Sequence, residues 1–305
     1  MGWKEELTLI VQDHTSASKL RFDEPLCKHT YFGIGGAAAA YFEVGTIGEL
    51  TAVAQLKKRW NVPVFILGRG SNLLVSDAGY PGIVVRLISE FDQLEFDGNL
   101  VHAGAGTSLP RLSKTAAQRG LSGVEFALGI PGSVGGALIM NAGAWGSSFG
   151  DLVERVEVMT AEGERIELSH NDAQFSYRHS RLDAHFCVTS ALLNLTLGDV
   201  EMITARMHEL YEKKVASQPF AEENAGCMFK NPPGYSAGKL IDECGLKGYR
   251  IGGAEVSKIH GNFILNIGNA TAQDVLNLVR HIQTHVKRER GIELEMEVKL
   301  LGFES

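Results

Sequence analysis

A glycine-rich stretch from Gly129 to Gly146 constrains this chain more than any other part of the sequence. Small residues alternate there with turn formers, so the backbone can approach another group closely. Pro131 suits the first turn of a helix, and residues 137–140 can continue it. The N–H groups at the start of such a helix form a binding site for an anion.

A second glycine-rich turn, Gly68–Asn72, lies upstream and follows the apolar run Val64–Leu67. Two turns that can each cradle an anion suggest a dinucleotide with a pyrophosphate. Glycine-rich loops are common, so two tight surface turns would explain the same residues, and this pattern leaves both interpretations open.

Length, charge and cysteine usage limit the number of domains, the binding partners and the kinds of cross-link that the chain can have. A chain of 305 residues suggests about two domains. The net charge of −7 argues against non-specific nucleic-acid binding, although local basic pockets remain compatible with it. The four cysteines show no C-x-x-C pair and so indicate neither zinc nor a disulfide framework: Cys27, Cys187, Cys227 and Cys244.

The N-terminus lacks the apolar core of a signal peptide, and no apolar run is long enough to cross a bilayer. We therefore expect a cytoplasmic protein with no membrane partner. The oligomeric state stays open, and a monomer is compatible with the sequence. No role emerges for residues 1–28.

The first part of the chain is typical of a small α/β unit. A helix is predicted over 47–60, with strands at 64–67, 73–75 and 83–87. Gly33, Gly35 and Ala38 fit a loose dinucleotide fingerprint, but no clear strand is predicted before them. A Rossmann site is therefore discounted.

From residue 88 onward, hairpins and helices are interleaved. Hairpins are predicted over 94–103 and 153–168, and a β-rich run over 186–197. Ser108 can cap a helix that has Pro110 in its first turn. This mixture indicates an α+β fold.

The last third of the chain resembles a separate α+β domain. Its predicted helices begin at Asp199, Ser236 and Thr271, and Gly291 closes the last of them. A strand is predicted over 262–267. The residues from 293 to 301 alternate strictly between apolar and polar, which predicts one final strand.

Ordered motifs along the chain together resemble one protein family. They are Gly68–Asn72, Gly129–Gly136 with Asn141–Gly143, Tyr177–Arg178, Gly226–Pro232, Ala237–Ile241 and Leu294–Val298. In this order, from about Thr30 to Gly302, they resemble the UDP-N-acetylenolpyruvoylglucosamine reductases (MurB family) of bacterial peptidoglycan synthesis.

The resemblance implies an FAD-binding fold of the vanillyl-alcohol-oxidase (PCMH-like) type, with two α+β subdomains and a C-terminal α+β substrate-binding domain. The expected boundaries are 1–87, 88–198 and 199–305, with the last strand returning to the active site. The short passage from Arg178 to Leu197 looks like the type that lacks an extra loop over the substrate.

The implied activity is that of an NADPH-dependent flavoprotein oxidoreductase. Bound FAD takes a hydride from the co-substrate NADPH and passes it to C3 of the enolpyruvyl sugar nucleotide. A proton added at C2 completes UDP-N-acetylmuramate. The preference for NADPH over NADH comes from the family alone.

Three residues match the family's catalytic positions: Arg178, Cys227 and Glu297. A guanidinium suits the substrate carboxylate, on which negative charge develops. Cys227 stands where the family usually has Ser, and a thiol, with a pKa of about 8.5, releases a proton more readily than an alcohol. Each residue also has an ordinary structural interpretation. Arg178 could form a surface ion pair, Cys227 could be a buried structural cysteine, and Glu297 could lie on the solvated face of a strand. Glu295 is a rival to Glu297 that we interpret as structural.

The remaining motif residues divide between cofactor and substrate. We expect the FAD site to use Gly68, Arg69, Gly70, Ser71, Asn72, Gly129, Pro131, Gly132, Ser133, Asn141, Ala142 and Gly143. The N–H groups of Gly70 and Gly132 would receive pyrophosphate oxygens. The expected substrate-binding residues are Tyr177, Lys230, Asn231, Lys239 and His260. No metal site is expected.

Three other functions are alternatives to this reductase activity. An FAD-dependent oxidase on the same flavin fold is the main alternative, and it would react quickly with oxygen. A non-catalytic flavin or sugar-nucleotide sensor would not need competent residues at 178, 227 and 297. A nicotinamide-only Rossmann dehydrogenase is opposed by the poor fingerprint and the hairpins.

Overall fold

The computed structural model describes residues 2–12 and 19–303, and the chain divides into two compact units. Unit 1 takes residues 1–22, 39–69 and 82–212; unit 2 takes residues 23–38, 70–81 and 213–305. Each unit collects segments from distant parts of the sequence. The boundaries 1–87, 88–198 and 199–305 stay a prediction about domains.

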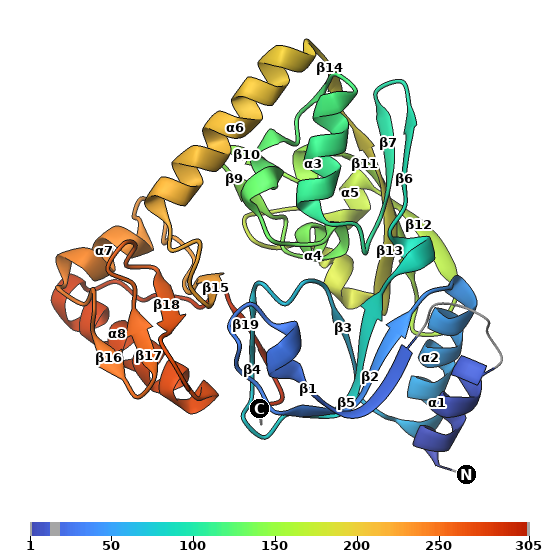
Figure 1. The fold of residues 1–305 in the computed structure, drawn as a ribbon, viewed down its shortest axis with the longest axis horizontal. Coiled ribbons are helices and arrows are strands. Elements are labelled where there is room, and N and C mark those ends of the chain that lie inside the picture. Colours follow the sequence, from blue (N-terminus) through green and yellow to red (C-terminus); the bar gives the residue numbers. More distant parts are fainter. Residues whose placement is uncertain (1, 13–18, 304–305) are drawn as a thin grey trace. The chain divides into compact units, whose positions relative to one another are not determined.

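The first sheet has the strand order β1-β2-β5-β3, in which β3 and β5 run parallel (Figure 1). Its strands are β1 Lys19–Pro25, β2 Ala37–Val44, β5 Tyr80–Leu87 and β3 Val64–Leu67. Helix α2 (Ile47–Trp60) links β2 to β3 and has the predicted bounds. Helix α1 (Trp3–Gln12) lies beside α2, where Glu6 accepts hydrogen bonds from Arg59 and Trp60.

Unit 1 also holds an antiparallel sheet of order β12-β11-β13-β7-β6. The predicted hairpins form β6 Leu94–Asp97 with β7 Leu100–Gly104, and β11 Val153–Met159 with β12 Arg165–Ser169; β13 is Cys187–Asn194. Ser108 caps α3 (Leu109–Gln118) as predicted. The smaller elements are α4 Val134–Ile139, α5 His170–Ala173, and the strand pairs β8 Leu121–Ser122 with β14 Thr196–Leu197 and β9 Gly143–Ala144 with β10 Ser147–Ser148.

Unit 2 contains a four-stranded sheet and a parallel strand pair. The sheet order is β15-β18-β17-β16, and the pair is β4 with β19. The strands are β15 Asn224–Cys227, β16 Arg250–Ile251, β17 Ala254–Val256, β18 Phe263–Asn266, β4 Leu73–Val75 and β19 Lys299–Leu301. The helices are α7 Ala237–Glu243 and α8 Ala272–Arg290. The chain passes from unit 1 to unit 2 within α6 (Val200–Ser217).

The predicted helix caps of this region are confirmed. Asp199 accepts the N–H of Met202 at the start of α6. Thr271 and Asp274 form a capping box on α8, which ends at Gly291 with a left-handed φ of 68°. Short 3₁₀ helices connect the remaining segments: Leu26–His29, Ser89–Phe91, Glu125–Gly129, Gly150–Leu152 and Arg181–Ala184.

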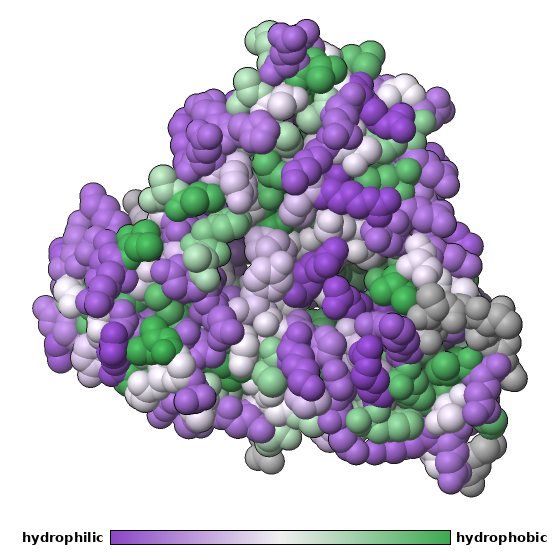
Figure 2. Space-filling model, in the orientation of Figure 1, coloured by the Kyte–Doolittle hydropathy of each residue, from purple (hydrophilic) through white to green (hydrophobic). Residues whose placement is uncertain are grey.

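Each unit is built on its own hydrophobic core. The core of unit 1 includes Phe42, Leu50, Val85, Leu109 and Phe149. The core of unit 2 is formed by other buried residues, among them Phe32, Leu74, Phe229, Leu278 and Ile282. On the face drawn in Figure 2, hydrophilic residues (purple) predominate. Apolar side chains are therefore concentrated inside the units rather than on this face.

The prediction of one continuous strand from Glu293 to Leu301 is wrong. Only Lys299–Leu301 forms a strand, pairing in parallel with β4. Upstream, Met296 makes an isolated bridge with Phe229. The segment changes partner near Val298, so the alternation breaks: Leu300 is 43% exposed, whereas Leu301 is buried.

A strand does precede the glycines at 33–36, contrary to the sequence interpretation, because β1 ends at Pro25. A 3₁₀ helix intervenes, however, and the glycines lead into strand β2 rather than a helix. A dinucleotide fingerprint requires a strand, the glycines and then a helix. The rejection of a Rossmann site therefore holds for a different reason.

Glu49 generates a stability prediction, because it is fully buried and accepts the backbone N–H groups of Gly45 (2.7 Å) and Thr46 (3.1 Å). We expect Glu49→Ala to lower the free energy of unfolding by about 1–3 kcal/mol, since buried donors lose their acceptor. Urea denaturation measures this value. Glu95→Ala, at an exposed position of β6, is the control and should change it by less than about 0.5 kcal/mol. Equal losses of unfolding free energy in the two variants would refute the stabilising role of the buried Glu49 carboxylate.

Candidate active site

The turn Gly68–Asn72 joins β3 to β4 and has the form of an anion cradle. In the part of the chain that the structure describes, the backbone N–H groups of residues 69–72 make no hydrogen bond to protein. Gly70 has a left-handed φ of 67°, and a Cβ there would lie 2.2 Å from the carbonyl oxygen of His29. Successive open N–H groups around such a residue form a concavity that binds phosphate oxygens. The turn fits the predicted role.

The second turn differs in detail from the prediction. Helix α4 begins at Val134 with Ser133 as its N-cap, so Pro131 precedes the helix instead of lying in its first turn. The N–H of Gly132 donates to the carbonyl of Ile130 (2.8 Å). This N–H is already paired, and the expectation that it receives a phosphate oxygen is wrong.

Gly68 at the start of the first turn and Ser133 in the second nevertheless meet within unit 1, whereas residues 70–72 of the first turn belong to unit 2. A Cβ on Gly68 would lie 2.7 Å from Oγ of Ser133. Any larger residue at 68 would require the Ser133 side chain to move. The hydroxyl of Ser133 is 3.4 Å from the N–H of Gly136, a long cap bond. Within unit 1 the fold therefore brings the start of the first motif next to the second.

Asn141 braces the segment that follows α4. It is 8% exposed and has a φ of 40°. Its Oδ1 accepts the N–H of Gly150 (2.8 Å), and its Nδ2 donates to the carbonyl of Ser176 (2.9 Å). The side chain is thus committed to the protein. Any contact of this residue with a flavin would use the backbone of the Asn141–Gly143 segment.

Arg178 lies on a tight turn beside that segment. Ser176 and His179 exchange two backbone hydrogen bonds, and Arg178 between them has a φ of 57°. Its Nη1 donates to the carbonyl of Gly143 (3.2 Å). The guanidinium also lies 5.4 Å from the ring centroid of Tyr177, which is 56% exposed. Unit 1 therefore unites the arginine motif with the second glycine motif.

Cys227 and Glu297 come together in unit 2. The N–H of Glu297 donates to the carbonyl of Met228 (2.8 Å), next to Cys227 at the end of β15. Nδ2 of Asn72 donates to the carbonyl of Glu297 (3.2 Å). Bonds to the backbone of Glu297 thus link the phosphate-type turn, through Asn72, to Met228, the neighbour of Cys227. Both Cys227 and Glu297 are partly buried.

Lys230 lies three residues after Cys227, beyond the end of β15. Its Nζ forms an ion pair with Glu295 (2.6 Å), and its N–H donates to the carbonyl of Glu295 (2.8 Å). This pairing agrees with the interpretation of Glu295 as structural. Asn231 follows, and its Oδ1 accepts the N–H of Ala237 at the start of α7 (2.9 Å).

His260 packs against α7, where a Cβ on Gly238 would lie 2.6 Å from its ring. Burial, and then the positive charge of Lys247, hold the pKa of His260 below its ordinary value. The ring is therefore neutral near pH 7. Its Nδ1 accepts the N–H of Asn262 (3.1 Å).

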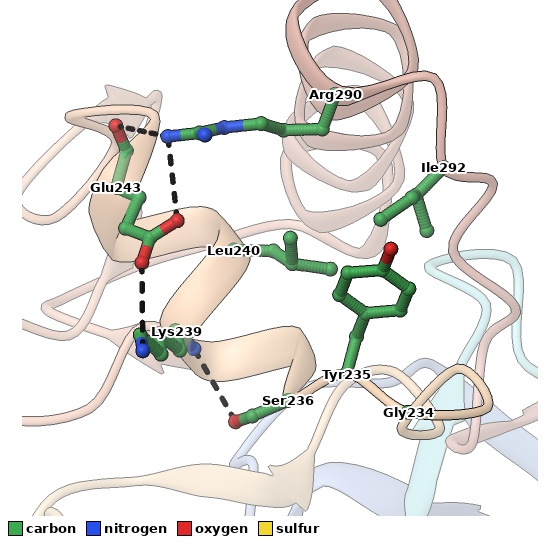
Figure 3. Close-up of a pocket in the computed structure, with 8 residues that line it drawn as sticks. All are labelled: Gly234, Tyr235, Ser236, Lys239, Leu240, Glu243, Arg290 and Ile292. Carbon is green, nitrogen blue, oxygen red and sulfur yellow. Dashed lines mark hydrogen bonds and ion pairs between the residues drawn. The ribbon is translucent and has the colours of Figure 1, made fainter.

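Lys239 lies elsewhere on α7, in a pocket of about 410 Å³ that contains no predicted catalytic residue (Figure 3). Glu243 lies between Lys239 (3.8 Å) and Arg290 (3.3 Å) there. The carboxylate offsets part of the positive charge that an anionic ligand would need.

Asn262 is a site residue that sequence reasoning missed. It is 3% exposed and is hydrogen-bonded to Phe229, two residues after Cys227. Its sequence context, a turn before an apolar strand, is that of any loop asparagine. No signal in the sequence distinguishes it.

The described residues contain no group of three or more His, Cys, Asp or Glu arranged to hold a metal. Among those residues, no helix has the length and apolar character needed to cross a bilayer. The structure places Arg178 in unit 1, and Cys227 with Glu297 in unit 2.

Comparisons with known proteins identify both parts of the chain. The family model "UDP-N-acetylenolpyruvoylglucosamine reductase, C-terminal domain" matches residues 218–301, and "FAD binding domain" matches residues 38–169. The UDP-N-acetylenolpyruvoylglucosamine reductase of Caldanaerobacter subterraneus subsp. tengcongensis is 45% identical over 285 residues, which cover 93% of this chain and 94% of that protein.

Two further relatives agree. UDP-N-acetylenolpyruvoylglucosamine reductase 2 of Symbiobacterium thermophilum is 42% identical over 98% of this chain and 96% of its own length. The crystal structure of the Thermus caldophilus reductase (MurB) matches with a TM-score of 0.80 and 42% identity, covering 93% of this chain and 98% of that one. The expected α+β flavin-binding fold with a C-terminal domain is confirmed. This chain belongs to the family of UDP-N-acetylenolpyruvoylglucosamine reductases.

Proposed function

We propose that this protein reduces UDP-N-acetylenolpyruvoylglucosamine to UDP-N-acetylmuramate, with FAD as bound cofactor and NADPH as reductant, in bacterial peptidoglycan synthesis. The observation that carries the proposal is the pair of bonds from Asn72 to the backbone of Glu297 and from Glu297 to Met228, which brings the backbone of the residue with the carboxylate beside the neighbour of Cys227 and next to a phosphate-type turn. Relatives with this activity in their names match nearly the whole chain.

The glycine turns fit a flavin dinucleotide. The open N–H groups of residues 69–72 suit pyrophosphate oxygens, and any larger residue at 68 would require the Ser133 side chain to move. The chemistry that bound FAD supplies is hydride transfer, from NADPH and then to C3 of the enolpyruvyl group. The chain contributes binding, orientation and a proton.

Arg178 holds the substrate carboxylate. Hydride addition at C3 moves negative charge onto C2 and this carboxylate, and a guanidinium stays charged while it stabilises that charge. The turn around Arg178 is fixed by the bond from Asn141 to Ser176, and its guanidinium by the bond to Gly143. The arginine is thereby oriented before substrate binds.

Cys227 delivers the proton to C2. The S–H bond breaks as the C2–H bond forms, and the thiolate recovers a proton from solvent. A positioned acid accelerates such a step by about a hundred- to ten-thousand-fold. Glu297 acts beside it by hydrogen bonding or polarisation around the enolate, since Met228 connects the two residues.

Tyr177, Lys230, Asn231, Lys239 and His260 remain the proposed substrate-binding residues. Lys230 is the best placed, because it lies only three residues after Cys227. The proposal also includes a cytoplasmic location, where the nucleotide substrate and NADPH are found, and three domains in chain order. A monomer is compatible with it.

The decisive experiment is anaerobic. The flavin-loaded protein is bleached with NADPH, and enolpyruvyl-UDP-N-acetylglucosamine is then added. Recovery of the oxidised flavin spectrum is expected. Bleaching without recovery, followed by rapid reoxidation in oxygen, would instead support an FAD-dependent oxidase. No flavin after reconstitution with FAD would refute both.

Cys227→Ala separates the two half-reactions. We expect flavin reduction by NADPH at the wild-type rate and a loss of about a hundredfold or more in flavin reoxidation by substrate, because the proton donor is gone. Stopped-flow absorbance of the flavin measures both steps. Cys187→Ala, a buried cysteine of β13, is the matched control and should retain both rates. Wild-type reoxidation in Cys227→Ala would remove the thiol from the mechanism.

Glu297→Gln and Glu295→Gln test which carboxylate acts. We expect Glu297→Gln to slow reoxidation by substrate at least about tenfold, because a positioned ionisable group is lost. Glu295→Gln should weaken only the exposed ion pair with Lys230, an effect that stays small in kcat. Full activity of Glu297→Gln would exclude it from catalysis.

Gly70→Ala tests the cradle. Its new Cβ would collide with His29, so the turn must move and FAD retention should fall strongly. Gly98→Ala is matched in backbone, with a φ of 58°, but nothing lies within 4 Å of the added Cβ. The absorbance ratio of flavin to protein after purification measures retention. Equal FAD content in the two variants would contradict the cradle.

A further inference from the structure

The segment from Cys227 to Lys230, which continues the chain beyond β15, is held along one edge by the segment that carries Glu297. Met228 accepts the N–H of Glu297, and Lys230 donates to Glu295, both at 2.8 Å. The other edge faces β18. There the regular pairing is interrupted by a bulge between Asn224 and Cys227, and it ends at the pair of Cys227 with Phe263. Ordinary strand pairing therefore stops at the proposed proton donor.

Asn262 continues that edge with its own groups. Its carbonyl accepts the N–H of Met228 (2.7 Å). Its Oδ1 accepts the N–H of Phe229 (2.9 Å), and its Nδ2 donates to the carbonyl of Phe229 (2.7 Å). The side-chain amide thus does for Phe229 what a neighbouring peptide group does in a sheet.

This anchor follows Gly226, whose N–H donates to Oδ1 of Asn224 (2.8 Å). The chain reaches Cys227 through Gly226, whose φ is 78°, and a Cβ there would meet only the carbonyl oxygen of Ser71, at 3.7 Å. Glycine resists rotation less than any other residue. The direction of the Cys227 side chain therefore depends on the bonds made just after it, at Met228 and Phe229.

We infer that Asn262 is a positioning residue that holds Cys227 in place for proton delivery. The inference rests on the proposed role of Cys227 in reducing the enolpyruvyl group. Its physical reason is that the rate of a proton transfer falls steeply when the donor is displaced, so that a shift of about 1 Å can cost about a hundredfold. The side-chain amide offers Phe229 both a donor and an acceptor at once, whatever the pH.

The test uses the flavin-loaded enzyme with Asn262→Asp and Asn262→Leu. We expect both variants to accept electrons from NADPH at the wild-type rate and to lose at least about tenfold in reoxidation by substrate near pH 7. The loss should lie in kcat, with KM for the sugar nucleotide largely unchanged. Reoxidation at the wild-type rate in a folded variant would overturn the inference.

The pH profile of Asn262→Asp gives a readout that general destabilisation would not. An ionised Asp cannot donate to Phe229, whereas a protonated one can. Burial and the facing carbonyl should raise the pKa of this introduced carboxyl above its usual value of about 4. Reoxidation relative to wild type should therefore recover as pH falls through that pKa, whereas Asn262→Leu should show no recovery.

Charged groups near position 262 affect wild type and variant alike, so the ratio of the two rates removes their effect. They are Lys230, Glu295 and Glu297 on the neighbouring segments, and His260 once it is protonated below its lowered pKa. A ratio that is constant with pH in Asn262→Asp would count against the hydrogen bond to Phe229. The Asp variant at low pH also keeps the test usable if Asn262→Leu does not fold.

Asn266→Asp is the matched control, because Asn266 lies on β18 and donates to Phe32 (3.1 Å) and Glu223 (2.9 Å), away from Cys227. It should lower the melting temperature but leave the reoxidation rate intact. An equal slowing in this control would reduce the Asn262 effect to general stability and refute the inference.

A double variant separates the inference from the proposed function. If Asn262 acts through Cys227, then Cys227→Ala with Asn262→Leu should be no slower than Cys227→Ala alone. If the two rate losses multiply in the double variant, Asn262 does not act through Cys227. That result would overturn the inference while the reductase activity stands. Reoxidation of Cys227→Ala at the wild-type rate would instead refute the role of the thiol and, with it, the inference.

Discussion

Backbone hydrogen bonding on both edges of the segment from Cys227 to Lys230 is the constraint on which the proposed site in unit 2 depends. One edge is bonded to the segment around Glu297, and the other to Asn262. Buried backbone groups must be paired, so this segment has little freedom to shift without leaving polar groups unsatisfied. The thiol, the carboxylate and the turn that carries Asn72 are thereby kept in one arrangement.

Unit 1 solves the same problem with a different asparagine. Asn141 bonds to Gly150 on one side and to Ser176 on the other, and so links the segment after α4 to the turn that presents Arg178. Both Asn141 and Arg178 have left-handed backbones, which carry some strain and persist only where surrounding bonds enforce them. In each unit, a buried amide is bonded beside a residue that we propose for catalysis.

The local structure could be read from the sequence because its signals are local. Thr46 with Glu49 and Thr271 with Asp274 form the capping boxes that begin α2 and α8, and each needs only residues three apart. The hairpins of the second sheet follow from alternation and glycine turns for the same reason. The last strand could not be predicted, because its two halves pair with different partners. The N–H of Gly132 was misjudged because its acceptor, the carbonyl of Ile130, depends on the fold of the turn.

The sequence by itself determined the family, the α+β class and the identities of the proposed chemical groups, because ordered motifs record these independently of geometry. Only the tertiary structure decided which polar groups are hydrogen-bonded or ion-paired within the protein. It paired Lys230 with Glu295, turned Asn141 inward and put Asn262 beside Phe229. These outcomes depend on contacts between segments far apart in the chain, and such contacts are set by packing rather than by any local pattern.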